Sequence, residues 1–75
     1  GLSKVKHMQS KVIYIAELYN EKQKLQIEER LMKLYGVFKV SIDIEEGAIF
    51  VDFETPANLN NLEKEVYDLG YKIIY

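Results

Sequence analysis

The spacing of apolar residues changes period several times along this chain, and these changes restrict the possible folds most strongly. Apolar and polar residues alternate from Val37 to Ile44 and again from Ala48 to Glu54. Alternation with a period of two is typical of strands buried on one face. The residues between the two runs, Glu45 to Gly47, contain a glycine suited to a tight turn. The two segments are therefore predicted to form a β-hairpin.

The segments on either side of this hairpin have helical spacing. From about Glu21 to Tyr35, apolar residues recur every three or four positions, after Asn20 and before Gly36, which are typical first and last residues of a helix. A second helix is predicted to begin at Asn58 or Asn60 and to end at Gly70. Four leucine and valine side chains form its buried stripe, namely Leu59, Leu62, Val66 and Leu69.

Two further strands are predicted, one before the first helix and one after the second. Lys11 to Glu17 is rich in β-branched and aromatic residues, and both alternating sets are apolar, which favours a central strand. Tyr71 to Tyr75 predicts a short last strand. The order of elements is strand, helix, strand, strand, helix, strand. We therefore predict an α+β, ferredoxin-like βαββαβ sandwich with a four-stranded antiparallel sheet and two helices on one face.

Composition sets further limits. The 75 residues suit one small domain, which we place at residues 8–75, because His7-Met8 resembles a vector junction and residues 1–7 are interpreted as a cloning remnant. The chain has no cysteine, which excludes disulfides and thiolate metal sites and fits a cytoplasmic protein. A net charge of -2 disfavours nucleic acid as a partner. No apolar run approaches the roughly 20 residues that membrane insertion requires.

A set of framework residues has the spacing of a known family. The set comprises Ile27-Glu28, Leu31, Leu34, Gly36-Val37, Val40, Ile42-Asp43 and Gly70-Tyr71. In this spacing the chain resembles the heavy-metal-associated (HMA) domain of metallochaperones, over about Lys11 to Tyr75. In that family, a Met-x-Cys-x-x-Cys segment before the first helix binds a soft ion such as Cu(I) on two thiolates. Asn20 and Gln23 stand at the cysteine positions here, so the resemblance implies the fold without the family's metal site.

Other loop positions also depart from the family pattern. Glu17 replaces the usual glycine, and Leu18 replaces the methionine, whose place in the core we expect Leu18 to fill. One interpretation is a capped helix with solvated acidic residues and no cofactor. The alternative is a metal-binding domain that holds a hard cation weakly on oxygen ligands. Its candidate ligands are Glu17, Asn20, Glu21 and Gln23.

Catalysis is not expected. Acylphosphatases share the predicted fold, but they need an arginine beside an anion-binding loop, whereas Arg30 lies in the middle of the first predicted helix. The chain offers no usable histidine or cysteine for a catalytic triad. The sequence therefore indicates a non-enzymatic protein.

The resemblance implies a role in metal transport or metal chaperoning through protein contacts. Family members dock their partners through the first loop, so the candidate partner-binding residues are Tyr19, Asn20, Glu21, Lys22, Gln23 and Tyr71. An aromatic residue at the Tyr71 position lies near the metal loop in family members. Without a metal, we expect Tyr71 to serve in packing.

A second candidate surface is the sheet face that the helices leave open. Alternation sends one set of side chains into the core, namely Ile13, Ile15, Val40, Ile42, Ile49, Val51, Phe53 and Ile73. The opposite set includes Tyr14, Phe50 and Ile74, which the topology makes neighbours on the open face. Such a cluster suits a homodimer or another protein partner; the alternative is cross-strand packing with no partner. A dimeric module that binds a small molecule between paired sheets is a further alternative.

Overall fold

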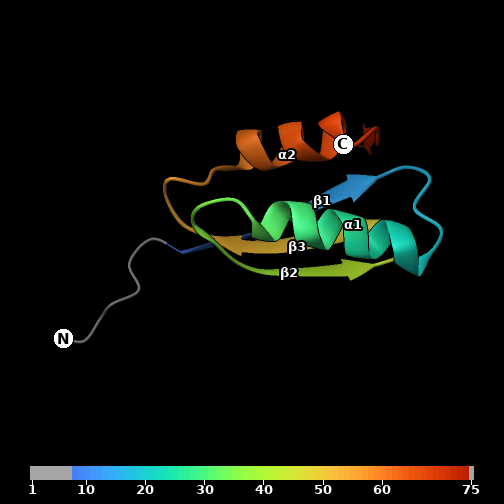
Figure 1. Cartoon of the computed structure of the whole chain (residues 1–75), viewed down its shortest axis with the longest axis horizontal. Coiled ribbons are helices and arrows are strands. Elements are labelled where there is room, and N and C mark those ends of the chain that lie inside the picture. Colours follow the sequence, from blue (N-terminus) through green and yellow to red (C-terminus); the bar gives the residue numbers. More distant parts are fainter. Residues whose placement is uncertain (1–7, 75) are drawn as a thin grey trace.

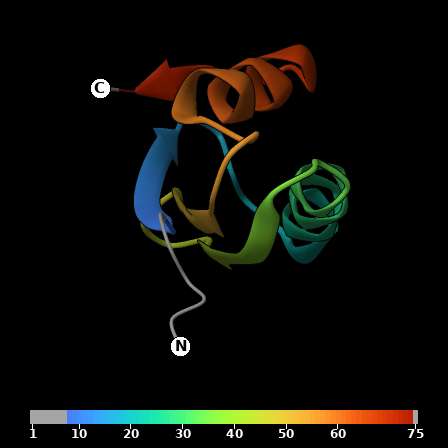
Figure 2. The same ribbon diagram turned by 90° about the vertical axis from the view of Figure 1, so that its left-hand side faces the viewer.

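The computed structural model describes residues 8–74, so the predicted cloning remnant at residues 1–7 lies outside the described residues. The elements are β1 (Gln9–Ile15), α1 (Glu21–Met32), β2 (Val37–Asp43), β3 (Ala48–Phe53), α2 (Leu59–Asp68) and β4 (Ile73–Ile74) (Figure 1). The strands form one antiparallel sheet in the order β2-β3-β1-β4. Both helices lie on the same side of this sheet (Figure 2). The predicted ferredoxin-like arrangement, with the first strand in the sheet interior, is confirmed.

The first strand is shifted toward the N-terminus relative to the prediction. It covers Gln9–Ile15 instead of Lys11 to Glu17, because Gln9 and Ser10 pair with Phe53 and Asp52 at the end of β3. At its other end, the Ala16 backbone N–H donates to the carbonyl of Lys72 at 2.9 Å, outside the paired strands. The alternating pattern alone did not reveal this shift, since polar Gln9 and Ser10 carry no strand signal.

The predicted boundaries of α1 and β4 were also too long. The helix ends at Met32 and not at Tyr35, because the N–H of Leu34 bonds to the carbonyl three residues back, at Leu31, which tightens the last turn. Tyr71 is not part of β4, because its N–H bonds to the carbonyl of Val66 at 3.4 Å. That bond is one of the two that terminate α2 in a Schellman motif.

The core lies between the sheet and the helices. Six of the predicted core residues are buried, namely Ile13, Ile15, Ile42, Ile49, Val51 and Phe53, while Val40 and Ile73 are half-buried beside them. The helices contribute Ile27, Leu31, Leu62 and Val66, which are completely buried. Burying each large side chain of this kind contributes about 1.5–3 kcal/mol. Leu18 is also buried, which confirms that it fills the core position expected for it.

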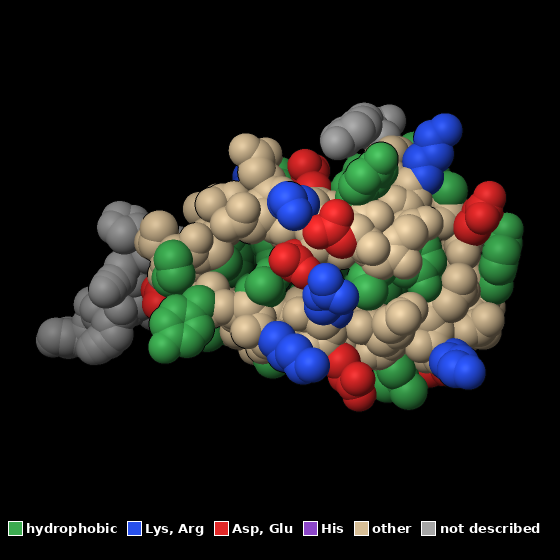
Figure 3. Space-filling model, turned by 45° about the horizontal axis from the view of Figure 1, so that its top comes forward, with side chains coloured by type: hydrophobic (Ala, Val, Ile, Leu, Met, Phe, Trp, Pro, Cys, Tyr) green, Lys and Arg blue, Asp and Glu red, His purple; other side chains and the backbone are tan. Residues whose placement is uncertain are grey.

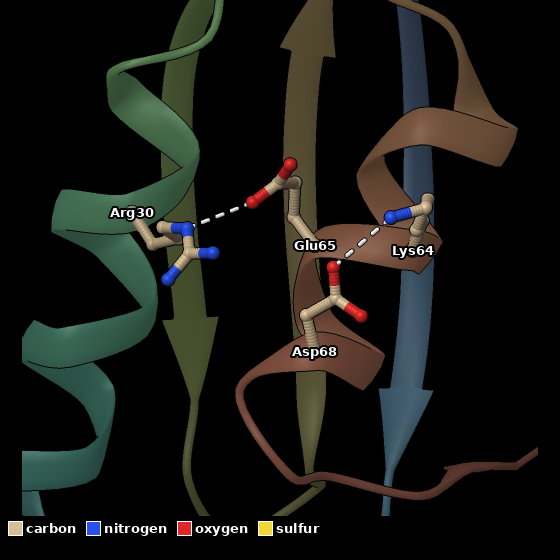
Figure 4. A network of polar contacts seen from close by, with 4 residues as sticks. All are labelled: Arg30, Lys64, Glu65 and Asp68. Atoms are coloured by element: carbon tan, nitrogen blue, oxygen red, sulfur yellow. Dashed lines mark hydrogen bonds and ion pairs between the residues drawn. The ribbon is translucent and has the colours of Figure 1, made fainter.

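One ion pair connects the two helices, and a second lies within α2. The Arg30 Nε donates to Glu65 Oε1 at 2.7 Å and joins α1 to α2, and Lys64 pairs with Asp68 along α2 at 3.1 Å (Figure 4). Acidic and basic side chains are interspersed over this side of the molecule (Figure 3). The face in view therefore shows no continuous basic patch among the described residues, and such a patch is what nucleic-acid binding requires. No helix within residues 8–74 has the length and apolar character needed to cross a membrane.

Candidate functional site

The loop from Ala16 to Asn20 joins β1 to α1 and is fixed on its inner side. The hydrogen bond from Ala16 to Lys72 ties it to the connection between α2 and β4, and the buried Leu18 side chain anchors it in the core. Tyr19 points the other way, with 73% of its surface exposed. The loop thus has a fixed inner side and an outer side open to a partner.

Asn20 and Gln23 form a reciprocal capping box at the start of α1. Asn20 Oδ1 accepts a hydrogen bond from the Gln23 backbone N–H at 2.9 Å. In return, Gln23 Oε1 accepts from the backbone N–H groups of Tyr19 and Asn20, at 2.6 and 3.2 Å. Gln23 Nε2 also donates to the carbonyl of Glu17 at 3.2 Å. The predicted cap is confirmed, and both amide groups are committed to holding the loop and the first turn of the helix.

Glu17 has a backbone conformation that the sequence did not reveal. Its φ is 63°, in the left-handed region that favours glycine. A side chain held there costs on the order of 1 kcal/mol or more. By the resemblance, Glu17 stands at a position where the family carries glycine, the residue that this conformation favours. The missing family glycine was the signal that could have predicted this strain.

Two of the four candidate metal ligands, Asn20 and Gln23, are engaged in hydrogen bonds to the backbone. The amide groups of Asn20 and Gln23 serve the backbone, and the side chains of Glu17 and Glu21 belong to exposed residues. Within residues 8–74, no three His, Cys, Asp or Glu side chains gather as an ion would require. Cu(I), the ion that the resemblance implies for this loop, prefers soft sulfur ligands, which the loop lacks. The residues present therefore do not fit a Cu(I) ion.

Tyr71 lies beside the first loop, where the resemblance implied. With Glu17, Gln23 and their neighbours it lines a pocket of about 320 Å³, whose remaining walls are Ala16, Leu69, Gly70 and Lys72. The Tyr71 side chain is half-buried and packs against the core, and its hydroxyl lies 3.5 Å from Gln26 Oε1. Tyr71 thus connects the end of α2 to the first turns of α1, in keeping with its expected packing role.

The outer surface of the loop continues along α1. A shallow depression of about 480 Å³ is lined by Asn20, Lys22, Gln23, Leu25, Gln26 and Glu29. Leu25 is 53% exposed, although it is a large apolar residue. Leu25 lies off the stripe formed by Ile27 and Leu31, and this position in the sequence was the available signal for its exposure. The candidate partner surface is therefore larger than the loop, and we call Tyr19 to Gln23 together with Leu25, Gln26 and Glu29 the loop surface.

The open sheet face is a separate location. Phe50 is paired with Val12 across β3 and β1, and Tyr14 is paired with Ile74 across β1 and β4. Their exposed fractions are between 38% and 49%. The three residues predicted to be neighbours are thus brought together, on the side of the sheet away from the helices.

Comparisons with known proteins identify the family. No protein-family model matches the chain. A COP-associated protein from Helicobacter felis is 30% identical over 47 residues, which cover 63% of this chain and 71% of that protein. The structure of a CsoZ metallochaperone is 46% identical and superposes with a TM-score of 0.86, covering 91% of this chain and 99% of the other.

More distant structures share the fold. A CopZ metallochaperone is only 16% identical, but it superposes with a TM-score of 0.85 over 88% of this chain and 100% of its own. The order of elements agrees with these likenesses. The chain therefore belongs to the heavy-metal-associated domain family of metallochaperones, as a member from which the paired cysteines are missing.

Proposed function

We propose that this domain takes part in metal trafficking by binding a protein partner through the loop surface, without carrying a soft metal on its own side chains. The observation that supports this most directly is the capping box. The two positions that hold thiolates in the family here hold amides whose hydrogen bonds stay within the loop and the first turn of the helix. The loop keeps its shape without a metal, and shape is what a docking surface requires.

The loop surface has the composition of a small binding site. Tyr19 and Leu25 are exposed apolar groups, at 73% and 53%, and they are accompanied by the charged residues Lys22 and Glu29. Tyrosine is frequent among the residues that dominate binding energy, and a polar rim supplies specificity. A partner with an apolar contact and mixed charges is the best match.

The proposed partner is the soluble metal-binding domain of a metal transporter. Its chemistry fits because family members meet such domains through this end of the fold. One structure of the same fold is a copper binding domain from HMA7, a P-type ATPase, which is 20% identical with a TM-score of 0.79. We propose no catalytic step, and we place the domain in the cytoplasm, which suits a chain without cysteine.

An NMR titration tests this function. The nitrogen-15-labelled chain is titrated with the metal-binding domain of the copper-transporting ATPase from the source organism. We expect saturable shifts at residues 19–26 and 71, and weaker binding by Y19A and L25A. The matched control is Y67A, which removes an exposed tyrosine from α2. Shifts confined to the open sheet face, or equal losses for Y19A and Y67A, would contradict the proposal.

A further inference from the structure

The open sheet face combines an apolar centre with two opposite charges at one edge. Strand β2 is an edge strand, and its ladder with β3 pairs Lys39 with Asp52, Ser41 with Phe50, and Asp43 with Ala48. Cross-strand partners share a face, so Lys39 and Asp43 lie on the same side of the sheet as Phe50. The loop surface does not include any of these residues.

The pairing registers arrange this face in three parallel rows. The middle row contains Ser41, Phe50 and Val12. One outer row contains Lys39, Asp52 and Ser10; the other contains Asp43, Ala48 and Tyr14, and it extends to Ile74. The outer rows differ in a matched way. The positive Lys39 in one row corresponds to the negative Asp43 in the other. The small Ser10 corresponds to the larger Tyr14, and the small Ala48 corresponds to the larger Asp52.

We propose that this face is a symmetric interface with a second copy of the same chain. A two-fold axis along the middle row exchanges the two outer rows between the copies. Lys39 of each copy then meets Asp43 of the other, so two ion pairs form at the rim. Phe50 and Val12 pack against their own counterparts at the axis. The match of charge and size thus selects a second copy as the occupant.

The exchanged rows also fit in shape and hydrogen bonding. Tyr14 of one copy covers Ser10 of the other, and Asp52 faces the small Ala48. The Asp52 carboxylate already accepts a hydrogen bond from Ser10 Oγ at 2.8 Å, so it keeps a partner when the second copy covers it. Face-to-face sheets pack with their strands within about 30° of each other, which is compatible with so short a patch.

Pairing of two β2 edges is a different assembly that also brings Lys39 opposite Asp43. That assembly leaves Phe50 uncovered, because Phe50 lies on the interior strand β3. The irregular register between Val37 and Lys39 also interrupts the β2 edge, and such bulges oppose edge-to-edge pairing. Dependence on Phe50 therefore distinguishes the two assemblies.

Sedimentation equilibrium on the full chain, up to about 1 mM, tests the charge match. We expect a monomer–dimer equilibrium whose Kd rises at least tenfold in K39E and in D43K, because like charges then meet twice in each homodimer. An equimolar mixture of the two variants restores both ion pairs, so its Kd returns to within about threefold of the parent value. This rescue has no explanation within a single chain. A parent that stays monomeric, or a mixture that associates no better than its components, would overturn the proposal.

The variant F50Q tests which face is covered. We expect F50Q to raise the Kd at least tenfold, whereas Y67Q, an equally polar change at an exposed residue of α2, leaves it within about twofold. Dispersed amide spectra establish that each variant is folded. Association that is unchanged in F50Q would overturn the face-to-face interface in favour of edge pairing.

Discussion

Asn20 and Gln23 hold each other in place at the start of α1. Asn20 Oδ1 lies 2.9 Å from the backbone nitrogen of Gln23, and Gln23 Oε1 lies 3.2 Å from the backbone nitrogen of Asn20. By the resemblance, these are the positions at which the family carries its two metal-binding cysteines. The same short spacing that lets two thiolates share one ion lets two amides share one helix terminus. The amides at these two positions thus take part in capping the helix and stabilise the loop through hydrogen bonds.

The first prediction concerns this cap. We expect N20A to lower the free energy of unfolding by about 1 kcal/mol, because the Gln23 backbone N–H loses its acceptor, Asn20 Oδ1. In a domain of this size, such a loss lowers Tm by about 4–8 °C. The matched control is N60A, in the first turn of α2, since Asn58 and not Asn60 caps that helix. Equal losses in N20A and N60A would contradict a specific role for the cap.

Glu17 gives a prediction in the opposite direction. We expect E17G to raise the free energy of unfolding by about 0.5–1 kcal/mol, because glycine adopts a φ of 63° without a steric cost. E17A removes the same charge but keeps the strain, so its unfolding free energy stays within about 0.5 kcal/mol of the parent. Urea denaturation measures both variants. Equal stabilisation by E17A and E17G would attribute the effect to charge and not to backbone strain.

Two glycines with positive φ provide a matched comparison. Gly36 has φ +91°, and a Cβ there meets the Glu54 carbonyl oxygen at 2.3 Å, while a Cβ at Gly70, with φ +105°, meets nothing within 4 Å. We expect G70A to lower the free energy of unfolding by about 1–2 kcal/mol, because alanine is strained in this backbone conformation. G36A adds a clash with the backbone, so it should lower the free energy of unfolding by about 1–3 kcal/mol more than G70A does. Thermal unfolding of the two variants checks this order, and a reversed order would be inconsistent with the packing of the α1–β2 connection.

The ion pair between the helices is expected to contribute little. Arg30 and Glu65 have side-chain exposures of 43% and 24%, so water and salt screen their interaction. A double-mutant cycle with R30A and E65A should give a coupling of about 0.5–1 kcal/mol that decreases in 1 M salt. The pair Lys64–Asp68, exposed by 70% and 41%, should give less. A coupling above about 2 kcal/mol at Arg30 would mean that this pair is a structural link and not a surface contact.

The order of elements and most of the core could be predicted because the apolar pattern is regular where the chain packs. Ile49, Val51 and Phe53 alternate in one strand, and all three are buried as expected. The Asn20 cap was also predicted, and Asn58 was one of the two residues considered for the second cap. Local pattern and tertiary packing agree in these segments, which is why reading the sequence succeeds there.

The backbone geometry of the loop between β1 and α1 could not be predicted from the sequence pattern. The left-handed conformation of Glu17 depends on two tertiary anchors, the buried Leu18 and the bond from Ala16 to Lys72, and neither is a property of residue 17 itself. Tyr71 was assigned to the last strand, whereas its backbone N–H completes the end of α2. The exposure of Leu25 depends on the position of α1 over the sheet, which periodicity specifies only approximately.

The most direct test of the central claim is a Cu(I) competition measurement on the parent chain and on N20C/Q23C. We expect the parent to leave Cu(I) with a chromophoric chelator and to show no saturable amide shifts. The double variant should take up one Cu(I), with shifts confined to residues 16–26 and 71, because we expect the loop backbone to place two thiolates at these positions close enough to share one ion. Binding of Cu(I) by the parent loop would contradict the account, and a folded N20C/Q23C that fails to bind would show that the loop geometry has changed as well.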